Sequence, residues 1–224
     1  MSIGTHNESS LHSDIKKWYF KPGDMVEEKH EGSIIDIKRG DILIEIQTKN
    51  FYAMSKKLRS LLKSNKVILV HPIAEEKHIL KVSDKGEVLN RRKSNKKGKI
   101  DDVFIELMRV PDIMCMENLT LEILMIKAEE IRCDDGKGSW RRKGVSIVDR
   151  RLVEVVSSHK FHNQRDLMKL LPKDMNHQFT NKELAKAMKV SGSKASKITY
   201  CFRKMGLMEE VGKRGRELLF QITQ

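Results

Sequence analysis

The stretch that decides the fold of the N-terminal part is SIIDIKRGDILIEIQTKN, residues 33–50. It holds two apolar segments, 33–38 and 41–48, which are separated by Arg39-Gly40-Asp41. A third segment, Met25–His30, precedes them across a Glu-Gly pair. Short β-prone segments separated by glycine breaks are typical of an antiparallel meander. We therefore predict three consecutive antiparallel strands.

Helical patterns flank this meander. Residues 11–19 are expected to form a short helix with Leu11, Ile15 and Trp18 on one stripe, and residues 51–62 a second helix. The run 67–70 (VILV) is apolar throughout, which is typical of a strand covered on both faces. The predicted order is helix, three strands, helix, strand.

Polar side chains interrupt the apolar strands of the meander. Asp36 closes one apolar segment, and Glu45 and Gln47 lie two residues apart on the next, so they share a face. A polar pair in such a strand is costly to bury without a partner, which could be a side chain, a water molecule or a metal ion. Carboxylates from adjacent strands can hold a hard divalent cation, and such an ion can activate water for phosphodiester attack.

With this strand order, residues 11–73 resemble the PD-(D/E)XK nuclease superfamily, the restriction-endonuclease-like fold that includes Holliday junction resolvases. The resemblance implies a central mixed sheet flanked by helices and Mg²⁺ (or Mn²⁺) as cofactor. It implies that Asp36 and Glu45 bind the metal, with Asp36 at the motif aspartate and Glu45 at the second acidic position. Gln47 takes the lysine position, which is a departure because it cannot act as a base. Lys49 can substitute only if the strand continues.

The superfamily's auxiliary acid is assigned to Glu28 in preference to Glu27 or Asp14. A plainer alternative stays open. Asp36 then only starts a turn, and Glu45 and Gln47 face solvent, since any half-exposed strand alternates polar and apolar residues.

The middle of the chain is less patterned. Residues 78–82 and 87–90 are expected to form a hairpin, 101–110 a helix, and 119–131 either a strand or a helix. The basic run 91–99 (RRKSNKKGK) is either a solvated loop or an arm that contacts phosphates. Trp140, in the basic loop DDGKGSWRRKG, either stacks on a base or anchors a core.

The C-terminal part has a helix–turn–helix pattern. Residues 148–157 and 163–171 are expected to be helical, and Thr180 and Glu183 form a capping box for a further helix. After the turn 190–192, a helix is expected over 194–205, followed by strands 207–211 and 217–222.

This order resembles the winged helix-turn-helix family across residues 150–224. The resemblance implies that the second helix enters a DNA major groove and that the basic strand tip contacts the backbone. The DNA-binding residues are then Lys194, Ser196, Lys197, Tyr200, Arg203, Lys204, Lys213, Arg214 and Arg216. The alternative is a winged helix used for protein contacts or dimerisation.

The charge balance favours a polyanionic partner. The 224 residues carry a formal net charge of +13. Residues 151–224 hold 15 Lys and Arg against 7 Asp and Glu, a difference of +8. Cations gain affinity for nucleic acids by releasing counterions. The three cysteines are scattered without zinc spacing, and no apolar run approaches the length of a membrane span, so we expect a soluble cytoplasmic protein with no membrane partner.

We therefore expect a flexible tail over residues 1–10, a nuclease-like α/β domain over 11–148 and a winged-helix domain over 149–224. The expected function is that of a metal-dependent DNA endonuclease, a hydrolase that its C-terminal domain targets to DNA. The alternative is a non-catalytic transcriptional regulator whose N-terminal domain mediates dimerisation or partner binding. A homodimer is possible in either case.

Overall fold

The computed structural model describes residues 9–223. Residues 1–8 of the predicted tail lie outside this range, and Ser10 already begins a helix. The α-helices are α1 (Ser10–Tyr19), α2 (Phe51–Leu61), α3 (Val103–Leu107), α4 (Asn181–Met188) and α5 (Gly192–Lys204). The strands are β1 (Met25–His30), β2 (Ser33–Arg39), β3 (Ile42–Ile46), β4 (Lys66–Val82), β5 (Val88–Lys93), β6 (Leu119–Asp134), β7 (Val145–Phe161), β8 (Gln178–Thr180), β9 (Met208–Arg214) and β10 (Glu217–Ile222). Short 3-10 helices are η1 (Ile100–Asp102), η2 (Pro111–Cys115), η3 (Trp140–Arg142) and η4 (Gln164–Leu170).

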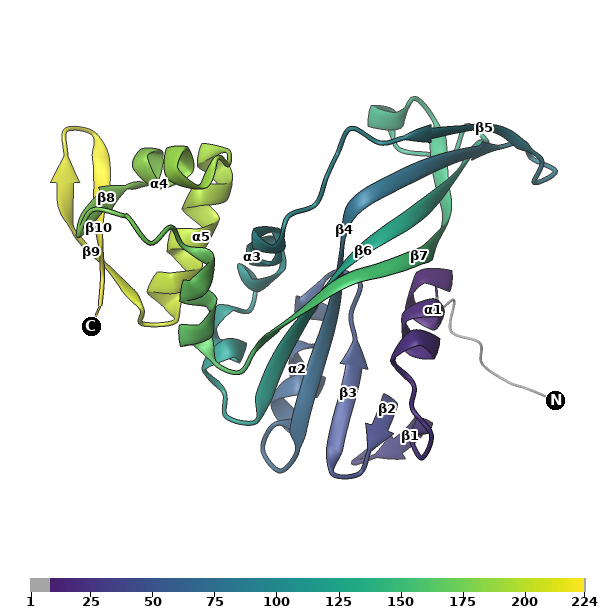
Figure 1. Cartoon of the computed structure of the whole chain (residues 1–224), viewed down its shortest axis with the longest axis horizontal. Helices are drawn as coiled ribbons and strands as arrows, with labels where there is room; N and C mark the ends of the chain where they lie inside the picture. Colours follow the sequence, from purple (N-terminus) through teal and green to yellow (C-terminus); the bar gives the residue numbers. More distant parts are fainter. Residues whose placement is uncertain (1–8, 224) are drawn as a thin grey trace.

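A seven-stranded mixed sheet forms the body of the protein (Figure 1), with the strand order β1-β2-β3-β4-β6-β7 and with β5 paired to β4. β1, β2 and β3 form the predicted antiparallel meander. β4 is parallel to both β3 and β6, and β7 returns antiparallel to β6. The predicted order of helix, three strands, helix and strand is confirmed, as is an α/β fold with a large mixed sheet flanked by helices.

The two N-terminal helices cover opposite faces of this sheet. α1 packs on one face through Leu11, Ile15 and Tyr19. α2 packs on the other face through Met54, Leu58 and their neighbours. The prediction that Trp18 completes the stripe of α1 was wrong, because Trp18 is 50% exposed and Tyr19 is buried instead. Tyr19 also donates a hydrogen bond to the buried Glu122, at 2.6 Å.

β4 and β6 are far longer than the sequence indicated. Pro72 follows the apolar run 67–70 and has no N–H to donate, which favours the end of a central strand. β4 instead passes through Pro72 and ends at Val82, so the predicted hairpin strand 78–82 is its outer half. Residues 119–134 are a strand, which resolves the open choice between strand and helix for 119–131. Register shifts between β4, β6 and β7 mark bulges along these strands, which together with β5 form an arm (Figure 1).

Two expectations about the C-terminal half were wrong. Residues 148–157 are not helical but belong to β7, where hydrogen bonds to β6 outweigh the local helical pattern. The predicted boundary between residues 148 and 149 therefore falls inside a strand of the large sheet. The other predicted stretch, 163–171, is helical, in the form of a 3-10 helix over residues 164–170.

The remaining C-terminal segment contains α4, a turn, α5 and the β9–β10 hairpin. β8 joins this hairpin to give a three-stranded sheet with the order β8-β10-β9. The predicted capping box of α4 is present, because Thr180 Oγ1 accepts from the N–H of Glu183 and the Glu183 carboxylate accepts from the N–H of Thr180. Ser191 caps α5.

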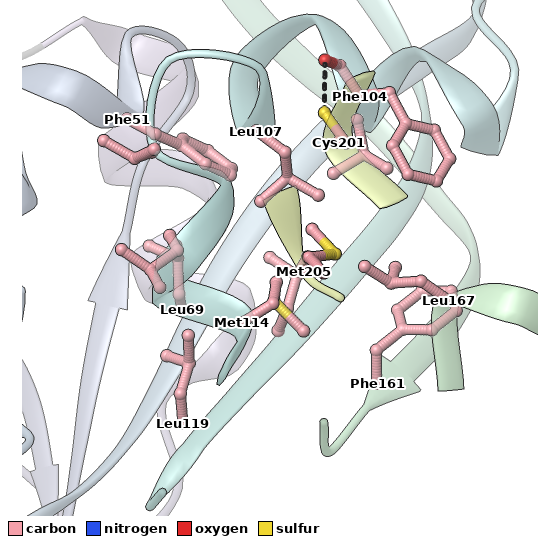
Figure 2. Packing of buried hydrophobic residues seen from close by; sticks show 14 of the residues in the cluster. Phe51, Leu69, Phe104, Leu107, Met114, Leu119, Phe161, Leu167, Cys201 and Met205 are labelled. Carbon is pink, nitrogen blue, oxygen red and sulfur yellow. Dashed lines mark hydrogen bonds between the residues drawn. The ribbon is translucent and has the colours of Figure 1, made fainter. Parts of the chain in front are cut away.

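One hydrophobic core joins this segment to the large sheet. Figure 2 shows Cys201 and Met205 of α5 beside Phe104 and Leu107 of α3. The rings of Phe104 and Phe202 lie 5.2 Å apart between centroids. Because both halves contribute to the same core, they pack as one body. Among residues 9–223, no helix has the length and apolar character needed to cross a membrane.

Lys194 belongs to this junction rather than to a free surface. Its Nζ lies 2.7 Å from Asp101 Oδ2 and 2.6 Å from Asp102 Oδ1, and its side chain is only 14% exposed. The expected role of Lys194 as a DNA contact is therefore not supported, since its ammonium group already forms ion pairs with two carboxylates of η1.

We predict that Lys194→Ala destabilises the protein, by on the order of 3 kcal/mol, because it leaves the buried Asp101 without its cation. Lys197→Ala, three residues further along α5, is the matched control and changes stability little. Urea unfolding of both variants measures the difference. Equal stability of the two variants would contradict this assignment.

Candidate functional site

Asp36 lies in β2, where it faces the first helix. Its Oδ2 lies 3.1 Å from His12 Nε2 and accepts a 2.8 Å hydrogen bond from the backbone N–H of Ile46. The opposite residue of β1, Glu27, has a φ of 54°, and its carboxylate pairs with Lys16 of α1 at 2.9 Å. β1 is thus distorted at the level of Asp36, and both acidic side chains contact α1.

Glu45 lies in β3 and is buried, with a side chain only 3% exposed. The alternative that this residue faces solvent is wrong. Its Oε1 lies 2.5 Å from Lys57 Nζ of α2, and the same amine donates to the carbonyl of Ile34. The ion pair is close but poorly directed, so Glu45 Oε1 has no hydrogen-bond partner among residues 9–223.

The two carboxylates are close enough for their charges to interact. Burial and the charge of Asp36 raise the pKa of Glu45 to about 7, although Lys57 acts in the opposite direction. Burial alone would raise the pKa of Asp36 as well, but the hydrogen bond and charge of His12 outweigh burial and lower it. The structure therefore moves the pKa values of the two acids in opposite directions, so that Asp36 ionises readily and Glu45 does not.

Gln47 lies just beyond the end of β3. Its amide nitrogen donates to the carbonyls of Lys49 and Asn50, at 2.6 Å and 3.1 Å. The backbone carbonyl of Gln47 accepts a hydrogen bond from the buried His71 ring at 2.7 Å. Gln47 thus holds the turn that leads into α2. The strand does not continue to Lys49, so the condition under which Lys49 would replace the motif lysine is not met.

Glu28, the predicted auxiliary acid, lies in β1 opposite Ile35 of β2 and is partly buried. Asp14, the other candidate, accepts a 3.1 Å hydrogen bond from the N–H of Leu152 and so attaches α1 to β7. Neither residue forms a described contact with Asp36 or Glu45.

A surface hollow of about 420 Å³ opens beside this cluster. His12 of α1, Gln47 to Asn50 after β3, and Arg150 of β7 are among its lining residues. Because His12 also contacts Asp36, a ligand in the hollow would lie one side chain away from that carboxylate.

The residues present are compatible with a magnesium-type ion. Among residues 9–223, no group of three His, Cys, Asp or Glu side chains is arranged to hold a metal. Mg²⁺, however, is commonly bound through one or two carboxylates, with water and substrate phosphates completing its shell. Asp36 and Glu45 would supply those carboxylates, and the buried Glu45 Oε1 has no hydrogen bond from the described part of the chain.

Sequence reasoning missed His12 and Lys57. Lys57 follows Met54 by three residues on α2, beside the stripe that packs on the sheet, and this spacing was a usable signal. His12 precedes Lys16 and Tyr19 on the buried side of α1. Its proximity to Asp36 depends on how α1 crosses the sheet, which periodicity does not report.

The predicted DNA contacts other than Lys194 lie on or near the surface. Ser196, Tyr200, Arg203 and Lys204 are exposed along α5, and Lys197 is partly exposed. The exposed tip of the β9–β10 hairpin carries Lys213, Arg214 and Arg216. Some of these cations have internal partners, since Arg203 pairs with Glu210 and Arg214 with Glu183.

We predict that Glu45→Gln stabilises the protein at pH 8 in the presence of a chelator. A raised folded-state pKa means that the folded protein retains a proton that the unfolded chain has released between about pH 4.5 and 7. Stability therefore falls as pH rises through this window, by up to about 3 kcal/mol. Urea unfolding at pH 5 and pH 8 measures the effect, with Glu28→Gln as the control. A Glu45→Gln variant that is less stable at both pH values would mean that the Lys57 ion pair outweighs burial.

Comparisons with known proteins identify relatives of this chain. Residues 9–162 match the sequence profile of a family described as "Domain of unknown function (DUF8091)". The match ends one residue after β7. The chain is also 32% identical over 222 residues to an "Uncharacterized protein" of Treponema pallidum (strain Nichols), covering 99% of this chain and 88% of that protein. No solved structure matches. The chain belongs to the DUF8091 family.

Proposed function

We propose that this protein is a metal-dependent DNA endonuclease. The observation that carries the proposal is the placement of Asp36 and Glu45 on the adjacent antiparallel strands β2 and β3, followed by the parallel strand β4. This is the position in which the PD-(D/E)XK resemblance expects the metal-binding acids. The buried, poorly satisfied Glu45 Oε1 supports a site that is completed by a ligand.

In this proposal Asp36 and Glu45 hold the ion. A divalent cation bound there would supply a Lewis acid for the phosphate and would lower the pKa of a bound water. Lys57, which is 26% exposed, would balance the charge of Glu45 and remain within reach of a phosphate oxygen. His12 orients Asp36 through their hydrogen bond. Gln47 would act by shaping the turn rather than by moving a proton.

The C-terminal unit would deliver the site to DNA. A helix–turn–helix followed by a basic hairpin is the arrangement expected of a winged helix. The exposed side of α5 carries Ser196, Tyr200 and Lys204, which suit phosphates and base edges. The opposite side of α5 packs on α3, so only one side of the helix would be available to a groove.

We predict metal-dependent cleavage of DNA by the intact protein. Purified protein is incubated with duplex, single-stranded and branched DNA in Mg²⁺, Mn²⁺ or chelator. Asp36→Asn and Glu45→Gln should each lower cleavage by at least about 100-fold, because each removes a metal ligand. They should also weaken Mn²⁺ binding measured by calorimetry. Glu117→Gln, at an exposed position outside the site, is the control and should retain both properties.

A second candidate is a non-catalytic DNA-binding regulator. The observation that favours it is the Gln47 amide, which is committed to backbone carbonyls where an active enzyme would place a lysine. Tight DNA binding without cleavage of any substrate, and without Mn²⁺ binding, would select this candidate.

The two candidates share a prediction for α5. The double variant Lys197→Ala/Lys204→Ala should weaken duplex binding about tenfold near physiological salt and reduce the salt dependence of affinity. Lys63→Ala in the turn after α2, which removes an exposed cation elsewhere, should change affinity little. Fluorescence anisotropy at several salt concentrations measures both. If the double variant binds like the control, α5 is not a DNA contact.

A further inference from the structure

A basic trough runs along the arm of the large sheet. Three adjoining hollows of about 420, 260 and 530 Å³ form it. The first two share Lys49 and Arg150, and the second and third share Lys77 and Glu130. The trough therefore continues from the hollow beside His12 to the far part of the arm.

The register of the sheet places the cations of the trough floor on one side. Lys77 and Ile79 of β4 lie two residues apart, as do Glu130 and Arg132 of β6, so each pair shares a face. Parallel pairing sets Ile79 beside Glu130. Arg150 of β7 completes the floor, since it is the register partner of Glu130.

Among residues 9–223, Glu130 is the only acidic residue that lines these three hollows, and it neutralises few of their cations. Its carboxylate contacts Arg132 at 2.6 Å, Lys77 at 3.1 Å and Arg150 at 3.1 Å. Burial would raise the pKa of Glu130, but these partners outweigh burial and lower it to about 2. One permanent negative charge thus faces three positive charges, and the floor keeps an excess of positive charge.

The other charged groups of the arm are paired differently. Arg91, Lys93 and Lys127 each have a carboxylate of their own, namely Glu129, Glu76 and Glu154. By contrast, Arg92, Lys96 and Arg141 line the trough and form no ion pair within residues 9–223. The unbalanced positive charge of the arm is therefore concentrated in the trough.

Residues 94–96 form one wall of the trough. Backbone hydrogen bonds to β4 hold this segment in place. The N–H of Ser94 donates to the carbonyl of Lys77 at 2.8 Å, and the N–H of Gly98 donates to that of Ala74 at 2.8 Å. A side chain at Gly98 would collide with Ile73 and Ala74, so glycine permits this close approach. The basic run 91–99 is thus partly strand and partly a loop fixed over β4.

Trp140 lies at the outer end of the trough. Its side chain is 83% exposed, so the alternative that it anchors a core is wrong. The guanidinium of Arg141, a trough residue, lies 5.5 Å from the ring centroid. A flat exposed ring beside unpaired cations suits an unstacked base more than a duplex, whose bases are covered.

We infer that this trough binds a single-stranded segment of nucleic acid, with a base stacked on Trp140 and phosphates along Lys49, Arg150, Arg92, Lys96 and Arg141. The outer half of β4 from Ala74 to Lys81 would span roughly 23 Å at the usual rise of a strand. That length suits a short single-stranded site of about 4–8 nucleotides. The inference concerns binding, and a protein unable to cleave DNA would retain it.

The test uses the full chain in chelator, so that cleavage plays no part. The sequence contains two tryptophans, and Trp18→Phe therefore leaves Trp140 as the only source of tryptophan emission. Titration with oligothymidylate of about 20 nucleotides should quench this emission. Quenching should be accompanied by saturable binding in fluorescence anisotropy.

Arg92→Gln/Arg141→Gln should weaken oligothymidylate binding at least about tenfold and lower its salt slope by about 1.4, the value for two lost phosphate contacts on a single strand. Lys56→Gln/Lys63→Gln, which removes two exposed charges from α2 and the turn that follows it, is the matched control and should bind normally. Both changed arginines are exposed, so folding is preserved.

Three results would overturn the inference. One is equal weakening by both double variants, which would indicate a general effect of net charge. Another is binding without any change in Trp140 emission. The third is tighter binding of duplex than of single strand with Trp140→Ala unaffected. Loss of cleavage in the endonuclease assay would leave these readouts unchanged, so failure of the two proposals is distinguishable.

Discussion

The pairing of β4 with three other strands is the constraint on which the rest of the structure depends. β4 is parallel to β3 and β6 and antiparallel to β5, so β6 pairs along one edge of β4 while β3 and β5 pair with the two ends of its other edge. Its inner half is buried between the two layers that contain α1 and α2. Its outer half extends away from the helices and carries the arm. The candidate site lies beside the inner half, and the basic trough follows the outer half.

Three buried carboxylates each form an ion pair with a cation from a different helix or strand. Glu45 of β3 pairs with Lys57 of α2, and Asp101 of η1 pairs with Lys194 of α5. Glu130 of β6 meets Lys77 and Arg150 from the neighbouring strands. A buried ion pair contributes little net stability, but losing one partner is costly. These pairs therefore fix how the elements are positioned relative to each other more than they add to stability.

The proposed activities use three parts of the molecule, of which the first two adjoin each other. The acidic pair lies at β2 and β3, and the trough begins at the hollow beside His12 and continues along the arm. The exposed side of α5 and the β9–β10 hairpin form a separate basic surface. Since α5 also packs on α3, the helix that would contact duplex DNA is joined to the large sheet by a shared core. A substrate with duplex and single-stranded parts would suit this distribution of surfaces.

Local pattern determined the N-terminal meander, α1, α2 and the capped helix α4, because their signals depend on neighbours a few residues apart. It also indicated Asp36 and Glu45 as a pair on adjacent strands. Tertiary structure alone decided that residues 148–157 form a strand, since β6 offers hydrogen bonds that no local signal reports. It likewise brought His12 to Asp36, Lys57 to Glu45 and Lys194 to Asp101. Contacts between elements depend on how those elements cross, and periodicity within one element carries no information about that geometry.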